Sequence, residues 1–83
     1  MAEQSTFHLI VASVGETFFD GAATSATLPT TAGEITVLPH HEPLVTTLKE
    51  GNITVRTTAE APKQFEVTSG VLEMSRNRAV VLL

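Results

Sequence analysis

The sequence predicts an all-β domain, a flattened antiparallel sandwich or barrel of about eight to ten short strands. Apolar and polar residues alternate with a period of two through most of the chain, most clearly at Ile53, Val55 and Thr57. No window places apolar residues at helical spacing between helix caps, and β-branched threonine and valine dominate. Turn signals recur about every 8 to 12 residues, a spacing typical of sandwiches and barrels.

The first half of the chain predicts strands of differing character. Residues 7–12 form the most apolar strand, and a turn at residues 14–17 leads to Phe18 and Phe19. Asp20 and Gly21 then predict a tight bend or a bulge. Residues 22–28 form a strand of short side chains that Pro29 is expected to end, and a loop at residues 30–33 precedes a short strand at residues 34–38. We expect most of the four phenylalanines in the core, with an exposed aromatic contact at Phe18 and Phe19 as the alternative.

The second half continues the same pattern. Gly51, in a turn at residues 49–52, is expected to adopt the positive φ that a hairpin requires. A turn at residues 59–62 and a break at residues 69–70 separate the later strands, and Asn77 tolerates the left-handed geometry of a last hairpin turn. The strands are expected at residues 44–48, 53–58, 64–68, 71–74 and 79–83.

Composition limits the class of protein. The 83 residues form one domain, and without cysteine its stability must come from a well-packed core or from burial against a partner. The net charge is −4 and the basic residues form no stripe, which argues against nucleic acid and anionic lipid surfaces as partners. Residues 1–6 show no secretory signal, and no apolar run reaches the ~20 residues needed to span a bilayer. We therefore expect a soluble, cytoplasmic protein.

Residues 33–51 are the most informative segment, because Pro39 and Pro43 bracket His40, His41 and Glu42 in a rigid corner that is neither helix nor central strand. Rigid, polar, exposed loops often serve recognition. One interpretation is a metal site, but adjacent residues of an extended chain point to opposite sides and do not converge on one ion. The others are a polar turn in which His41 bonds neighbouring backbone, and a contact with another protein.

Catalytic constellations are lacking. The serines stand without a nucleophile elbow, no glycine-rich phosphate cradle is present, and no tyrosine, tryptophan or cysteine is available to line a pocket. A chain this small can scarcely enclose an active site. We therefore expect neither an enzyme nor a cofactor.

Several motifs, in order, resemble the epsilon subunit family of F-type ATP synthases, whose mitochondrial counterpart is called delta. Phe-His-Leu opens the first strand, Phe-x-Gly ends the segment at residues 19–21, and Gly-Glu stands at residues 33–34. Pro-x-His-x-Pro-Leu at residues 39–44 and Leu-x-x-Gly at residues 48–51 are the more specific elements, and Ser-Gly-Val-Leu-Glu follows at residues 69–73. The match runs along nearly the whole chain.

The resemblance implies a ten-stranded sandwich at the foot of the central stalk. Such a domain does no chemistry, and it would lock the gamma subunit to the ring of c subunits so that proton- or sodium-driven rotation becomes torque. By position, Ser13 and His41 match residues that lie against gamma, and Glu34 matches a residue that meets the polar loops of the c ring, which commonly offer arginine. The resemblance further implies a peripheral place at the cytoplasmic face of the cell inner membrane, without insertion.

Two departures from the family pattern stand out. Family members usually continue into a two-helix hairpin that restrains ATP hydrolysis, whereas this chain ends at Leu83, so we expect a single sandwich domain over residues 1–83 without that hairpin. Where relatives often carry two consecutive glycines, this chain has Ser69 and Gly70. The alternative function is a freestanding cupin-like β-module in which His40, His41 and Glu42 touch a ligand or metal, although cupin histidines are spaced to share one face of a strand.

Overall fold

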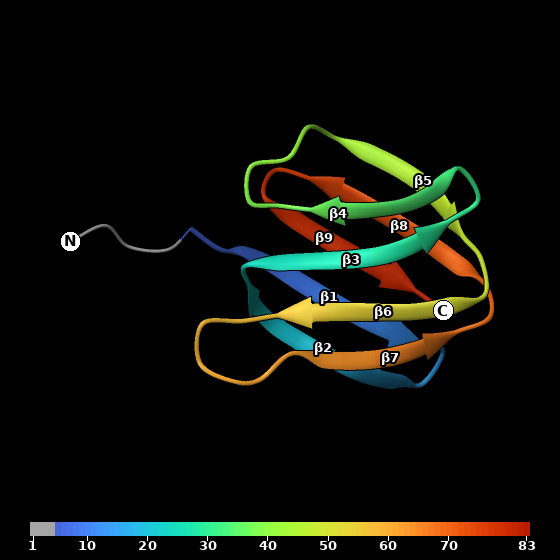
Figure 1. The fold of residues 1–83 in the computed structure, drawn as a ribbon, viewed down its shortest axis with the longest axis horizontal. Coiled ribbons are helices and arrows are strands. Elements are labelled where there is room, and N and C mark those ends of the chain that lie inside the picture. The colour runs from blue at the N-terminus through green and yellow to red at the C-terminus, as the bar shows by residue number, and fades with distance from the viewer. Residues whose placement is uncertain (1–4) are drawn as a thin grey trace.

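The computed structural model describes residues 5–83, which form nine β-strands and no helix (Figure 1). The predicted absence of a secretory signal concerns residues 1–6, and residues 1–4 of that segment lie outside the described residues. No helix in the described range is long and apolar enough to cross a bilayer. The strands are β1 (Phe7–Ser13), β2 (Glu16–Ala23), β3 (Ser25–Thr30), β4 (Gly33–Val37), β5 (Leu44–Leu48), β6 (Gly51–Arg56), β7 (Lys63–Val67), β8 (Gly70–Ser75) and β9 (Arg78–Leu82).

The strands form one strongly curled sheet that folds into two layers. One layer has the order β2-β1-β9-β8-β5, and the other holds β4, β3, β6 and β7, with β4 and β6 on opposite edges of β3. A single register pair, Thr30 with Leu48, joins the layers where β3 meets β5. In Figure 1 the β3, β4, β6 and β7 ribbons lie in front of β1, β8 and β9.

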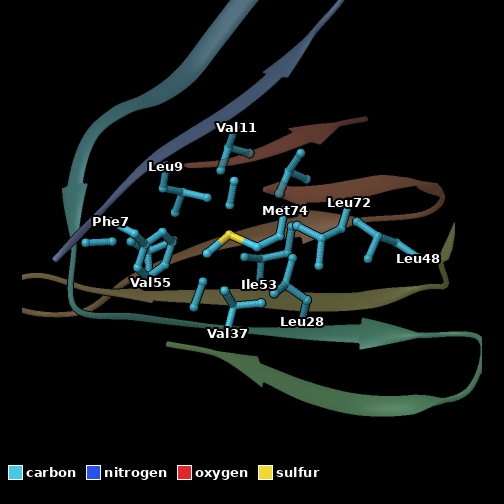
Figure 2. Packing of buried hydrophobic residues seen from close by; sticks show 14 of the residues in the cluster. Phe7, Leu9, Val11, Leu28, Val37, Leu48, Ile53, Val55, Leu72 and Met74 are labelled. Carbon is cyan, nitrogen blue, oxygen red and sulfur yellow. The ribbon is translucent and has the colours of Figure 1, made fainter. Parts of the chain in front are cut away.

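The core fills the space between the layers, and Figure 2 shows its side chains meeting from both sides. Inward and outward positions alternate along each strand, so that Leu72 and Met74 of β8 are buried while Val71 and Glu73 are exposed. Fifteen hydrophobic residues make up the buried cluster: Phe7, Leu9, Val11, Ala23, Ala26, Leu28, Val37, Leu48, Ile53, Val55, Val67, Leu72, Met74, Ala79 and Val81. The all-β prediction, the strand number and the sandwich architecture are confirmed.

One pairing departs from the predicted antiparallel arrangement. β1 pairs with β9 in parallel, from His8 with Arg78 to Ala12 with Leu82, while the other strand pairs are antiparallel. A parallel pair cannot be closed by a tight turn, and the connection here runs through the seven intervening strands. The pair brings the beginning and the end of the described chain together.

The first hairpin also differs from the prediction. Asp20 and Gly21 lie inside the continuous strand β2 rather than in a bend. The predicted bulge is present two residues earlier, because the register passes from Val11 with Phe19 to Ala12 with Thr17 and leaves Phe18 unpaired. The hairpin turn is correspondingly tight, with Gly15 at a φ of 81°.

The prediction for Pro29 needs correction, whereas that for Gly51 is confirmed. Pro29 does not end its strand, because β3 continues to Thr30 and Pro29 stands opposite Glu34. Gly51 has the predicted positive φ, 158°, and Pro29 also restricts a side chain there, because its Cγ would lie 2.9 Å from an added Cβ. Gly70 is constrained in the same way, since a Cβ would lie 2.5 Å from the carbonyl oxygen of Leu82.

The phenylalanines are only partly core residues. Phe7 is fully buried, Phe19 and Phe65 pack half-buried against the core, and Phe18 is exposed. The rings of Phe18 and Phe65 are 6.4 Å apart between centroids and tilted by 49°. We expected most of the four phenylalanines in the core, and Phe7 is the one that is fully buried there.

Candidate partner-binding surface

The proline-bracketed loop between β4 and β5 is held by hydrogen bonds at each of its two histidines. His40 adopts a φ of 63° and donates its amide hydrogen to Oδ1 of Asn77 over 2.7 Å. The amide of His41 donates to the carbonyl of Leu38 (3.2 Å). Its Nδ1 lies 2.8 Å from the carbonyl oxygen of Glu42, which can only accept, so Nδ1 carries the hydrogen. The predicted polar turn in which His41 bonds neighbouring backbone is confirmed.

The metal interpretation of this loop finds no support in the geometry. Within residues 5–83, no group of three or more histidine, aspartate or glutamate side chains is placed to hold a metal ion. His8, the third histidine, instead places Nε2 2.6 Å from Oδ1 of Asp20, an ion pair when His8 is protonated.

Two hollows lie in the seam between β2 and β7. The larger, about 480 Å³, is lined by residues of β2 and of the segment that follows β6, and the smaller, about 310 Å³, by Phe18, Phe65 and Leu83 among others. Neither is lined by His40, His41 or Glu42. A cupin-like site would require these three residues to converge on a cavity, and neither of the two hollows is such a cavity.

Ser13 and His41 lie at opposite ends of one sheet. Ser13 ends β1, half-buried and in register with Glu16, whereas the exposed His41 lies beside the β8–β9 turn, next to the start of β1. The length of β1 separates these ends by about 20 Å at ~3.3 Å per residue. In Figure 1 the β4–β5 loop is on the left and the turn after β1 on the right.

Between these two ends, the outer side of the β1-β9-β8-β5 layer forms an apolar face. In one row across the strands, Ile10 pairs with Val80, Val80 with Glu73, and Glu73 with Val45. In the next row, Ala12 pairs with Leu82 and Leu82 with Val71. Residues in register share a face of the sheet. We define the apolar face by the members Ile10, Ala12, Val45, Val71, Val80 and Leu82.

The apolar face is exposed to solvent in its centre, on β8 and β9, and at one margin, on β5. Val45 is 68% exposed, Leu82 56% and Val71 40%. Isolated exposed hydrophobics are normal on protein surfaces, but a contiguous set of them marks an interaction site. This surface was not predicted from the sequence. The sequence does carry a signal for it, because residues 79–83 form a near-continuous apolar run. A strand with one solvent-exposed face would alternate apolar and polar residues.

The opposite layer presents a polar outer face. Thr36, Thr27, Thr54 and Gln64 stand in register across β4, β3, β6 and β7. The hydroxyls of Thr27 and Thr36 are 3.0 Å apart, and Nε2 of Gln64 donates to Oγ1 of Thr54 over 3.4 Å. Among the described residues, no large hydrophobic side chain on β3, β4, β6 or β7 is exposed. We call this surface the threonine face.

Glu34 lies at the same end of the sandwich as Ser13, the end that also carries the β3–β4 and β5–β6 turns. It is exposed near the start of β4, opposite Pro29. The two turns are joined where the amide of Lys49 donates to the carbonyl of Pro29 (3.0 Å) and that of Thr31 to Thr47 (3.0 Å). The register places further carboxylates at the same end, Glu16, Glu50 and Glu66. The structure thus separates Glu34 from His41 by the length of the strands.

Comparison with known proteins gives a consistent result. Residues 6–83 match the family described as "ATP synthase, Delta/Epsilon chain, beta-sandwich domain". The chain is 33% identical over 78 residues to the ATP synthase epsilon chain of Delftia acidovorans, covering 94% of this chain and 56% of that protein. It is 35% identical over 78 residues to that of Janthinobacterium sp. (strain Marseille), covering 93% and 56%. The chain thus spans little more than half the length of these relatives.

Solved structures share the fold. A chain in the cryo-EM structure of the Euglena gracilis mitochondrial ATP synthase, OSCP/F1/c-ring, superposes with a TM-score of 0.86 at 20% identity, covering 93% of this chain and 49% of that one. A chain in the Tetrahymena thermophila mitochondrial ATP synthase central stalk and c-ring structure gives a TM-score of 0.79 at 16% identity, covering 98% and 65%.

Proposed function

This chain belongs to the beta-sandwich family of ATP synthase delta and epsilon chains, and on that premise we propose that it is the sandwich part of a non-catalytic rotor subunit. In this role it couples the gamma subunit to the c ring, so that ion-driven rotation is transmitted to the catalytic head. The observation that carries the proposal is the apolar face, which extends between Ser13 and His41.

The apolar face supports contact with gamma. Ser13 and His41 match, by position, family residues that lie against gamma, and a partner that reaches both must cover the surface between them. That surface is lined by exposed valine and leucine side chains with Glu73 in their midst. Stable protein interfaces bury apolar side chains of this kind together with some polar groups. Burial of Val45 and Leu82 would contribute favourable hydrophobic free energy to the contact.

Glu34 supports contact with the c ring at the acidic end of the sandwich. The carboxylates of Glu16, Glu34, Glu50 and Glu66 share that end with a single lysine, Lys49. Polar loops that offer arginine would meet a surface of complementary charge there. Such charge complementarity contributes more to the specificity of docking than to affinity. Contact through exposed charges should weaken as salt is raised.

The proposal places the chain in a peripheral, membrane-associated complex, on the cytoplasmic side, with no chemistry of its own. A tightly packed β-body transmits force because close-packed interiors are stiff. The loop at residues 38–43 adds a rigid contact, since Pro39 and Pro43 limit its conformations.

Co-expression with gamma and c subunits from the same source, followed by size-exclusion chromatography, tests the proposal. We expect the chain to elute with gamma and, when the ring is present, with both. His41→Ala should weaken the gamma complex and Glu34→Ala the ring complex. Both variants should unfold within about 0.5 kcal/mol of the parent, because exposed substitutions rarely cost more. Elution of the parent chain apart from gamma would overturn the proposal.

A further inference from the structure

The side chain and backbone of Asn77 connect three segments that are far apart in the sequence. Its Oδ1 accepts the amide hydrogen of His40 (2.7 Å), and its Nδ2 donates to the carbonyl of Thr6 (2.9 Å). Its own carbonyl accepts the amide hydrogen of His8 (3.1 Å). The β8–β9 turn therefore holds both the entry to β1 and the β4–β5 loop.

The backbone of Asn77 is suited to this place. Arg76 and Asn77 have φ angles of 51° and 59°, the two consecutive left-handed residues of a tight hairpin turn. Asparagine tolerates this geometry better than most residues and, unlike glycine, carries an amide that can reach neighbouring chain. The donors and acceptors around it also determine the orientation of the amide, because the His40 amide can only donate and the Thr6 carbonyl can only accept.

His40 is the residue that needs support. Its φ of 63° is sparsely populated by residues other than glycine. Such a conformation persists only where the surrounding contacts require it. The Asn77 side chain supplies that contact from outside the loop, while the bonds of His41 to Leu38 and Glu42 lie within the loop. The orientation of the His41 side chain therefore depends on the backbone of His40, which Asn77 holds in place.

We propose that Asn77 is a positioning residue that orients the His40–His41 loop for contact with the partner. The inference rests on the proposed function, because it assigns His41 to the gamma contact. Asn77 acts through the loop and does not itself need to touch gamma.

Two substitutions separate the side chain from the backbone. Asn77→Gly keeps the left-handed conformation but removes both side-chain bonds. Asn77→Asp keeps the Oδ1 acceptor for His40 but replaces the donor to Thr6 with a second acceptor, so it is the control for the bond to His40. We expect amide hydrogen exchange at His40 to accelerate in Asn77→Gly and to stay near the parent rate in Asn77→Asp.

Binding to gamma gives the second measurement. The loss of one hydrogen bond predicts an affinity about three- to tenfold lower for Asn77→Gly, with most of the loss restored in Asn77→Asp. In a His41→Ala background, Asn77→Gly should lower the affinity little further, because the two residues act through one contact.

The outcomes distinguish the two proposals. Unchanged exchange at His40 in Asn77→Gly overturns the positioning role, whatever happens to binding. Faster exchange without loss of affinity, where the parent binds gamma, overturns the link between the loop and the partner. If the parent does not bind gamma, the proposed function fails, and with it the assigned role of the loop, even where exchange shows that Asn77 holds His40.

Discussion

The two outer faces of this sandwich are built on one core and yet differ in chemistry. The threonine face satisfies its side chains with cross-strand hydrogen bonds, such as that between Thr27 and Thr36. The apolar face leaves Val45, Val71 and Leu82 exposed. The inward positions of both layers are alike, hydrophobic and mostly buried. The fold therefore depends on the inward residues, and the two outer faces can differ in chemistry without changing it.

The largest effect is expected from the core that both faces share. Leu72 of β8 is fully buried, and its truncation to alanine should lower the free energy of unfolding by about 2 to 5 kcal/mol. Chemical denaturation measures the loss. Val71→Ala, at the adjacent outward position, is the control and should cost far less. Equal losses for both variants would show that Val71 is buried in the isolated chain, contrary to the assignment of an apolar face.

A smaller effect, confined to binding, should separate the faces. Val45→Lys places a charge on the apolar face, and Thr54→Lys makes the same change on the threonine face. Val45→Lys should weaken gamma binding about ten- to a hundredfold, because an ammonium group buried in the contact without a partner is costly. Thr54→Lys should leave binding unchanged, and both variants should melt at similar temperatures. Isothermal titration against purified gamma measures the difference. Equal weakening by the two lysines would remove the distinction between the faces as docking surfaces.

Much of the fold could be predicted from the sequence, because period-two alternation is a local property. Ile53 and Val55 alternate with polar neighbours, and the structure buries both. The loop at residues 38–43 was also predictable, since Pro39 and Pro43 act on their own residues and the ones before them. The hydrogen bond from His41 to Glu42 joins adjacent residues, and it too was within reach of a local argument.

The features that could not be predicted depend on contacts between distant parts of the chain. The parallel pair of β1 and β9 joins residues about 70 positions apart, and no local pattern encodes it. Asn77 reaches His40 and Thr6 across 37 and 71 positions. Pro29 was expected to end β3, and the structure instead pairs it with Glu34 and packs it against Gly51. The apolar face arises in the same way, because Ile10, Val45 and Leu82 are brought together only by the strand order.

The smallest effect concerns the threonine face itself. Thr27→Val keeps the β-branched shape of the side chain and removes the hydroxyl that lies 3.0 Å from that of Thr36. Cross-strand pairs contribute about 0.2 to 1 kcal/mol, so the loss should lie in that range. A double-mutant cycle with Thr36→Val isolates the pair, since each single change removes the same bond. Valine at both positions makes this face more apolar without supplying Ser13, His41 or the shape that gamma would fit. Gamma binding should therefore stay at the parent level, whereas tighter binding by the double variant would mean that hydrophobicity alone, and not the arrangement of one face, selects the partner.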